Sequence, residues 1–201
     1  ISGSATGNFA AKNVGTGLTV TVTGTSTGGA QGTDYTLTMP ALPANILARA
    51  LTVTAATNSK IYDATTAASA TPTITSGALQ GSDTAGFTEA YAVKDVGTGL
   101  TLTPTGTAND GNGGANYTVT FANSANGTIT AKALTVSGLS VADKTYDATT
   151  AETVSGTAAL AASEAAGAGT TADGKPYTGD TVSISGSATG NFAAKNVGTG
   201  L

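Results

Sequence analysis

The sequence contains no cysteine, no histidine and no tryptophan among its 201 residues. Without histidine and cysteine it lacks the usual ligands of transition metals and the commonest general base, and neither Ser-His-Asp nor Cys-His nucleophilic sites can form. Only 10% of the residues are charged, and acidic residues outnumber basic ones to give a net charge of −4. Because nucleic-acid binding needs clustered Lys and Arg, we expect no nucleic-acid partner.

Long hydrophobic runs and paired carboxylates are missing as well. No run of 18 apolar residues occurs, so we expect no transmembrane segment in this fragment. Acidic residues are sparse and no two share a strand face, which predicts that the chain is not an enzyme and carries no cofactor. The loop DGNGGAN at 110–116 could offer oxygen ligands to Ca²⁺. It lacks the closing Glu of an EF-hand, and a Gly-rich hairpin loop is the simpler interpretation.

What the sequence does contain is repetition. The segment ISGSATGNFAAKNVGTGL occupies residues 1–18 and recurs unchanged at 184–201, which is 183 positions later (184 minus 1). We therefore expect a repeating period of 183 residues within a longer polypeptide. Inside it the landmarks ALTV, YDATT, VGTGL and YT-x-T recur in one cyclic order. For example, KIYDATTAA at 60–68 returns as KTYDATTAE at 144–152.

These landmarks predict three segments. Residues 50–132 form a complete module, 1–49 form the C-terminal part of another, and 133–201 form the N-terminal part of a longer one. The extra length of the longer module falls at 161–180, a stretch of small and turn-forming residues that is typical of an inserted loop. The expected partners are further repeats of the same polypeptide, or like chains joined head-to-tail.

Alternation of apolar residues with threonine predicts an all-β fold. Leu18–Thr23, Tyr35–Met39 and Tyr117–Phe121 each alternate with the period of a half-buried strand. Short strands between turn signals indicate tandem antiparallel immunoglobulin-like β-sandwich modules, and the absence of padding before ALTV indicates a rod. Only 157–167 could form a turn of helix, which weakens the alternative of β-grasp-like modules. The predicted core of the complete module is Leu51, Val53, Ile74, Leu100, Leu102, Tyr117, Val119, Phe121 and Ile129.

Tyrosines at fixed places are the most recognisable candidate site residues. Tyr35 and Tyr117 stand in Gly-x-x-Tyr before a strand, as a tyrosine corner would. Tyr62-Asp63 and Tyr146-Asp147 begin the two YDATT motifs. We interpret them as structural, with Asp capping a turn and the Tyr hydroxyl satisfied at the edge of the core. A ligand contact is the competing interpretation.

Lysines near these motifs raise a further possibility. Lys60, Lys94, Lys144 and Lys195 could form intramolecular isopeptide bonds if each met a buried Asn or Asp together with an acidic residue. Pairing of Lys with Asp at a turn is the simpler interpretation.

The motif K-x-YDATTAA, together with KNVGTGLTVTVTG at 12–24 and GTDYTLT at 32–38, resembles the YDG-type (MBG-like) tandem repeats. These repeats, typically K-x-YDGTTAA, occur in large bacterial surface adhesins related to filamentous haemagglutinins. Ala64 and Ala148 stand where those repeats usually have Gly. We therefore expect that the turn does not need a positive φ here.

The resemblance implies an extracellular location, on the bacterial cell surface or in a secreted filament. It implies a structural stalk or filament-forming segment that spaces a distal binding tip and supports cell adhesion or biofilm formation. The alternative is that each module is itself a glycan- or matrix-binding unit.

Overall fold

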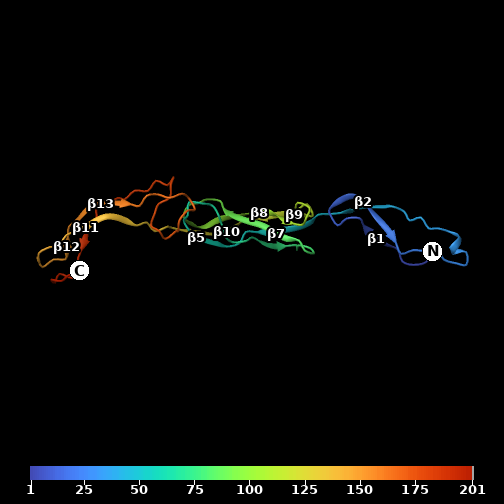
Figure 1. Cartoon of the computed structure of the whole chain (residues 1–201), viewed down its shortest axis with the longest axis horizontal. Helices are drawn as coiled ribbons and strands as arrows, with labels where there is room; N and C mark the ends of the chain where they lie inside the picture. Colours follow the sequence, from blue (N-terminus) through green and yellow to red (C-terminus); the bar gives the residue numbers. More distant parts are fainter. Residues whose placement is uncertain (201) are drawn as a thin grey trace. The chain divides into compact units, whose positions relative to one another are not determined.

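The structure is a computed structural model that describes residues 1–200. Leu201, the last residue of the predicted segment 133–201, lies outside the described residues. The chain is all-β, as predicted, with strands in several sheets (Figure 1). Over residues 1–200 the only helical segment is the 3-10 helix η1 (Gly32–Asp34), and no helix could span a membrane. The turn of helix suggested at 157–167 does not form: residues 157–160 end the strand β13 (Val154–Leu160), and residues 161–167 are not helical.

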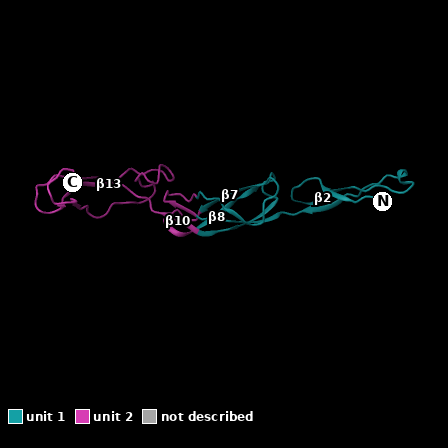
Figure 2. Cartoon of the chain, turned by 90° about the horizontal axis from the view of Figure 1, so that it is seen from below, with its two compact units in different colours: residues 1–57, 68–90, 101–125 teal, residues 58–67, 91–100, 126–201 magenta. Residues whose placement is uncertain are grey.

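The chain divides into two compact units whose residues are interleaved along the sequence (Figure 2). Unit 1 holds Ile1–Thr57, Ala68–Ala90 and Thr101–Ala125. Unit 2 holds Asn58–Ala67, Tyr91–Leu100 and the residues from Asn126 onward. The predicted module boundaries follow the sequence repeats instead and stay a prediction.

A three-stranded antiparallel sheet of unit 1 shows the predicted alternation most clearly. Leu18, Val20 and Val22 are half-buried while the threonines between them are exposed, because successive side chains point to opposite faces of a strand. The sheet has the order β1-β2-β3, with Leu18 opposite Ala44. Its strands are β1 (Thr6–Phe9), β2 (Gly15–Thr23) and β3 (Leu42–Ile46).

A second three-stranded sheet of unit 1 carries much of the core. Leu51 and Tyr117 are buried with Ala108 in one hydrophobic cluster, against which Ile74, Leu79 and Val119 pack. β4 pairs antiparallel with β6 and parallel with β9, with Leu51 opposite Val119. The strands are β4 (Arg49–Thr54), β6 (Thr73–Ser76) and β9 (Tyr117–Ala122).

A four-stranded sheet has the order β5-β10-β8-β7. β5 and β10 pair in parallel, with Gly127 opposite Asn58. The expectation of wholly antiparallel pairing is therefore wrong for β4–β9 and β5–β10. In both pairs the chain makes a long connection before it returns, and such connections permit parallel strands where a tight hairpin cannot. The strands are β5 (Asn58–Ile61), β7 (Thr84–Tyr91), β8 (Gly97–Asn109) and β10 (Ser124–Thr130).

Two small antiparallel sheets complete unit 2. β11 pairs with β13, and β12 pairs with β14. Val136, Leu139 and Val141 of β11 are all exposed, so this part of the unit buries little apolar surface. The remaining strands are β11 (Val136–Val141), β12 (Ala151–Glu152) and β14 (Gly190–Asn191).

The predicted core is largely confirmed. Leu51, Val53, Leu102, Tyr117 and Ile129 are buried. The prediction that Phe121 belongs to the core is wrong, because its side chain remains 39% exposed. It lies on β9, an edge strand of its sheet, and makes an edge-to-face contact with Phe87 at 6.1 Å between ring centroids. The other predicted core residues, Ile74, Leu100 and Val119, are half-buried.

The strand expected at Tyr35–Met39 does not form, and Tyr35 is 71% exposed. Its counterpart Tyr117 begins β9, which is held by pairing with the ALTV strand β4. Among residues 1–200, no strand pairs with the segment 35–39. The same alternating pattern thus gives a strand only where its neighbour is present.

Candidate functional site

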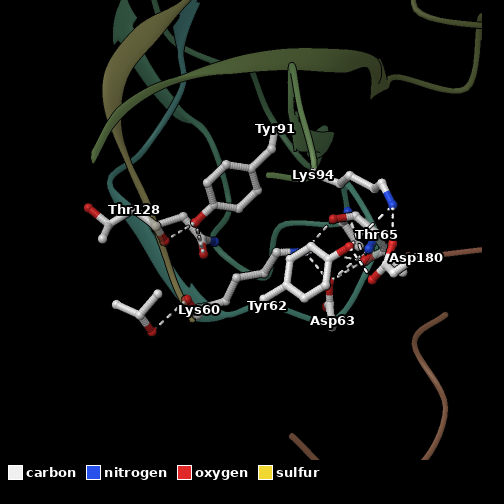
Figure 3. Close-up of polar contacts among 11 residues, drawn as sticks. Lys60, Tyr62, Asp63, Thr65, Tyr91, Lys94, Thr128 and Asp180 are labelled. Carbon is white, nitrogen blue, oxygen red and sulfur yellow. Dashed lines mark hydrogen bonds and ion pairs between the residues drawn. The ribbon is translucent and has the colours of Figure 1, made fainter. Parts of the chain in front are cut away.

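The first YDATT motif forms a closed turn immediately after β5. Asp63 Oδ1 accepts hydrogen bonds from the backbone N–H and the hydroxyl of Thr65, both at 2.9 Å. Lys60 Nζ donates to Asp63 Oδ1 and to the backbone carbonyl of Thr65, both at 2.7 Å (Figure 3). The carboxylate caps the turn, and the lysine joins the two ends of the turn to each other.

The second YDATT motif repeats this construction in residues that belong to the longer predicted module. Asp147 Oδ1 accepts from the backbone N–H and hydroxyl of Thr149, again at 2.9 Å. Lys144 Nζ lies 3.0 Å from Asp147 Oδ1 and donates to the backbone carbonyl of Ala151. Two stretches of similar sequence therefore build the same Lys–Asp–Thr side-chain contacts, although the lysine donates to the carbonyl of Thr65 in the first and of Ala151 in the second.

The residue after each aspartate adopts a left-handed backbone. Ala64 has a φ of 61° and Ala148 a φ of 64°. The expectation that this turn does not need a positive φ is therefore wrong. The aspartate side chain bonds the backbone N–H two residues on, which closes a tight turn and fixes the intervening residue in the region that favours glycine.

An aromatic ring faces each turn lysine. Lys60 Nζ lies 5.3 Å from the centroid of the Tyr91 ring, and Lys144 Nζ lies 5.9 Å from that of Phe192. The backbone hydrogen bond beside the ring is also the same in both turns. Tyr91 N–H donates to the Thr66 carbonyl and Phe192 N–H donates to the Thr150 carbonyl, both at 2.8 Å.

The Tyr91 hydroxyl anchors the first ring. Its one proton is shared between Asn58 Oδ1 and the Thr128 carbonyl, each 3.1 Å from the hydroxyl oxygen (Figure 3). Phe192 has no hydroxyl, so the second turn lacks this anchor.

The two YDATT tyrosines differ in their surroundings. Tyr62 donates its hydroxyl to Asp180 Oδ2 at 2.7 Å, and Lys94 Nζ lies 2.9 Å from Asp180 Oδ1 (Figure 3). Tyr62 also meets Tyr177 edge-on, with ring centroids 5.9 Å apart. Tyr146 is instead 55% exposed. The structure thus brings Tyr62 together with the far end of the 161–180 stretch, and leaves Tyr146 open to solvent.

Charge and burial set the ionisation of these groups. Burial of Asp63 acts to raise its pKa, but hydrogen bonds from Lys60 and Thr65 outweigh it and hold the pKa below its ordinary value. The Thr149 backbone N–H, together with Lys144, lowers the pKa of Asp147 to about 2. Both aspartates are therefore firmly ionised near neutral pH.

The contacts among Tyr62, Lys94 and Asp180 shift the pKa of each of the three groups. Burial and the hydrogen bond to Asp180 raise the pKa of Tyr62. Asp180 raises the pKa of Lys94, and Lys94 lowers that of Asp180. Near neutral pH Tyr62 is therefore neutral, Lys94 is positive and Asp180 is negative. These charge states preserve the hydrogen bond and the ion pair that hold Asp180 against Tyr62 and Lys94.

Tyr117 lies in unit 1 and has a satisfied hydroxyl, as a core-edge tyrosine should. It donates to Asp83 Oδ2 at 2.7 Å and accepts from the Gln80 backbone N–H at 2.8 Å. Tyr35, the other predicted corner tyrosine, is exposed and does not begin a strand.

The loop considered for Ca²⁺ uses its carboxylate internally. The two Asp110 oxygens accept from the backbone N–H groups of Asn112, Gly114 and Asn116 at 2.7–2.9 Å. Throughout residues 1–200, no group of three or more acidic side chains is placed to hold a metal ion. The arrangement is that of a self-capped hairpin loop.

A cluster in unit 2, whose lysine side chain is buried and whose two acidic side chains are largely buried, was missed at the level of sequence. Lys132 meets Glu164, Asp173 and the ring of Tyr177. The four lysines considered for isopeptide bonds did not include Lys132. The one available signal was that AKALTV carries Lys where ARALTV carries Arg49, while the acidic partners lay in a stretch interpreted as an inserted loop.

Comparison with protein families matches residues 47–126 to the YDG domain. Comparison with curated proteins and with solved structures gave no match. The matched range includes the first YDATT turn, from Lys60 to Thr65, and Tyr117. The resemblance carried by the K-x-YDATTAA motif is therefore confirmed for this part of the chain, since residues 47–126 match the YDG domain.

Proposed function

We propose that the chain is a structural stalk or filament-forming repeat segment of a bacterial cell-surface adhesin, located outside the cell. In this proposal immunoglobulin-like sandwich modules follow one another as a rod and space a distal binding tip. The observation that carries the proposal is the paired YDATT turn. Both copies direct Lys, Asp and Thr into contacts within the chain, which suits a joint that must be built many times.

The repetition of sequence supports the same role. Eighteen residues recur without change after 183 positions, and a spacer requires copy number rather than variety. Contacts between residues 60–65 and residues 164–180 support a joint with little slack. The Gly167 N–H donates to the Asp63 carbonyl at 2.8 Å, beside the Tyr62–Asp180 hydrogen bond.

The proposal assigns no reaction and no cofactor to this segment. Asp63, Asp147 and Asp110 are engaged with lysines or backbone N–H groups rather than held ready for proton transfer to a substrate. The proposed partners are further repeats of the same polypeptide, and the alternative is like chains joined head-to-tail.

One observation favours the alternative that each module binds glycan or matrix polymer. Tyr146 is exposed and lines a surface hollow with Asp143, Lys144 and Phe192. An exposed tyrosine ring beside polar groups can stack on a sugar. Most of the sequence's few aromatic residues lie elsewhere, so we rank this function second.

A binding assay separates the two functions. The purified chain and its Tyr146→Ala variant would be tested against arrays of glycans and of extracellular matrix proteins. The stalk proposal expects no binding by either protein. Specific binding by the original chain that Tyr146→Ala abolishes would instead establish the binding-module function.

A further inference from the structure

Lys132 lies between β10 and β11, and its side chain is only 3% exposed. Its Nζ is 2.8 Å from Glu164 Oε1 and 2.9 Å from Asp173 Oδ1. The Glu164 carboxyl group lies beside that of Asp173 and helps to lower the pKa of Asp173. A primary amine and two carboxyl groups therefore meet inside unit 2.

The cluster is enclosed by an aromatic ring and by backbone. The Tyr177 ring is buried, and its centroid lies 4.0 Å from Lys132 Nζ. Gly169 has a φ of 64°, and a Cβ there would collide with the Glu164 and Asp173 carboxyl groups. The backbone thus packs directly on the acidic side chains, which keeps water away from the amine.

Both acidic residues are held in place. The Glu164 N–H donates to the Pro176 carbonyl at 3.0 Å, and its own carbonyl accepts from Thr178 N–H. Asp173 Oδ1 accepts from the Lys175 N–H at 3.0 Å. Fixed reactants at hydrogen-bond distance, with solvent excluded, are the conditions under which an intramolecular reaction is strongly accelerated.

We propose that Lys132 and Asp173 condense into an intramolecular isopeptide bond, with Glu164 carrying a proton between them. The driving force is the cost of holding an ammonium group and a carboxylate in a desolvated site. The amide that replaces them is neutral. This inference does not depend on the proposed stalk function.

The step balances without any further reactant. A proton first passes from the Lys132 ammonium to the Asp173 carboxylate, leaving a neutral amine and a carboxylic acid. The Nζ electron pair attacks Asp173 Cγ to form the C–N bond, and the Glu164 carboxylate accepts the proton that the nitrogen must lose. Glu164 returns this proton to the departing Asp173 hydroxyl, the C–O bond breaks, and one water molecule leaves.

Glu164 is needed because the ion pair is the resting state. Burial acts to lower the pKa of Lys132, but hydrogen bonds to Glu164 and Asp173 outweigh it and raise the pKa. The hydrogen bond from Lys132 correspondingly lowers the pKa of Asp173. A second carboxyl group in contact with both partners gives the proton a path between them.

The other lysine pairs of unit 2 do not share this arrangement. Lys60 and Lys144 pair with aspartates only three positions away, so a bond there would join the ends of one turn. The Lys94 side chain is 43% exposed. At the position equivalent to Lys132 in ARALTV the chain has Arg49, which cannot form such an amide.

Intact-mass spectrometry of the purified full chain tests the proposal. The measured mass of the folded chain should be lower than the mass calculated from its sequence by that of one water molecule. A proteolytic digest should yield one branched peptide that joins the Lys132 and Asp173 segments. Lys132→Arg keeps a cation between the two carboxylates but cannot form the amide. The measured mass of this variant should therefore equal the mass calculated from its own sequence. Glu164→Gln should do the same while circular dichroism confirms that the strands are retained.

Lys144→Arg is the matched control, and it should still lose one water. A folded original chain with the full sequence mass would overturn the proposal, as would a cross-link mapped to any other lysine. Water loss that persists undiminished in Glu164→Gln would overturn the role of Glu164.

Discussion

Ala64 and Ala148 occupy the same position of the two YDATT turns, and both hold a left-handed backbone, with φ values of 61° and 64°. Alanine is strained in this region because its Cβ crowds the following carbonyl. Each turn retains the conformation because Asp63 or Asp147 bonds the backbone N–H on the far side of the alanine. The hydrogen-bond network of the turn therefore overcomes the preference of the residue.

Replacing the strained alanine by glycine should stabilise the fold. Ala64→Gly removes the left-handed strain at some cost in chain entropy, and we expect a net gain of about 1 kcal/mol in the free energy of unfolding. Urea denaturation would measure it. Ala78→Gly is the control, since Ala78 is exposed and has no positive φ, and it should be neutral or destabilising. Equal effects at both positions would show that Ala64 is not strained.

Removing the carboxylate of the first turn should be costly. Asp63→Ala deletes the acceptor of three hydrogen bonds and leaves the largely buried Lys60 without its carboxylate partner. We expect a loss of about 1–3 kcal/mol in the free energy of unfolding. Asp34→Ala changes an exposed residue of η1 and should alter stability little. A loss at Asp63 no larger than that at Asp34 would contradict the structural role of the motif.

The second turn should weaken in acid. The pKa of Asp147 is lowered to about 2 in the folded chain, below the ordinary value near 4, so the folded state favours the ionised form. Its stabilising contribution is complete above about pH 4 and is lost as the pH falls toward about 2. The urea midpoints of the original chain and Asp147→Asn should differ at neutral pH and converge near pH 2. A constant difference across this range would refute the assignment.

The sequence predicted those features that depend on local pattern. The alternation at Leu18–Thr23 correctly gave a strand with threonines outward, and Leu51, Val53 and Leu102 were correctly placed in the core. The interpretation of Asp63 as a turn cap also follows from local chemistry and is what the structure shows.

Features that depend on distant segments were not predictable in this way. Whether an alternating segment becomes a strand depends on its neighbour, as Tyr35 and Tyr117 demonstrate. The Lys132 cluster draws on residues up to 45 positions apart (177 minus 132), so no spacing rule could have identified it. The positive φ of Ala64 arises from the hydrogen bonds around it, whereas the preference of alanine pointed the other way.

The proposed stalk is tested most directly by measuring length against copy number. Proteins with one, two and three copies of the 183-residue period would be joined through the shared 18-residue sequence, so that every junction is native. Small-angle X-ray scattering would give the maximum dimension of each. The account predicts that this dimension grows by an equal increment with each added period. Growth that levels off toward the square-root dependence of a flexible chain would contradict it.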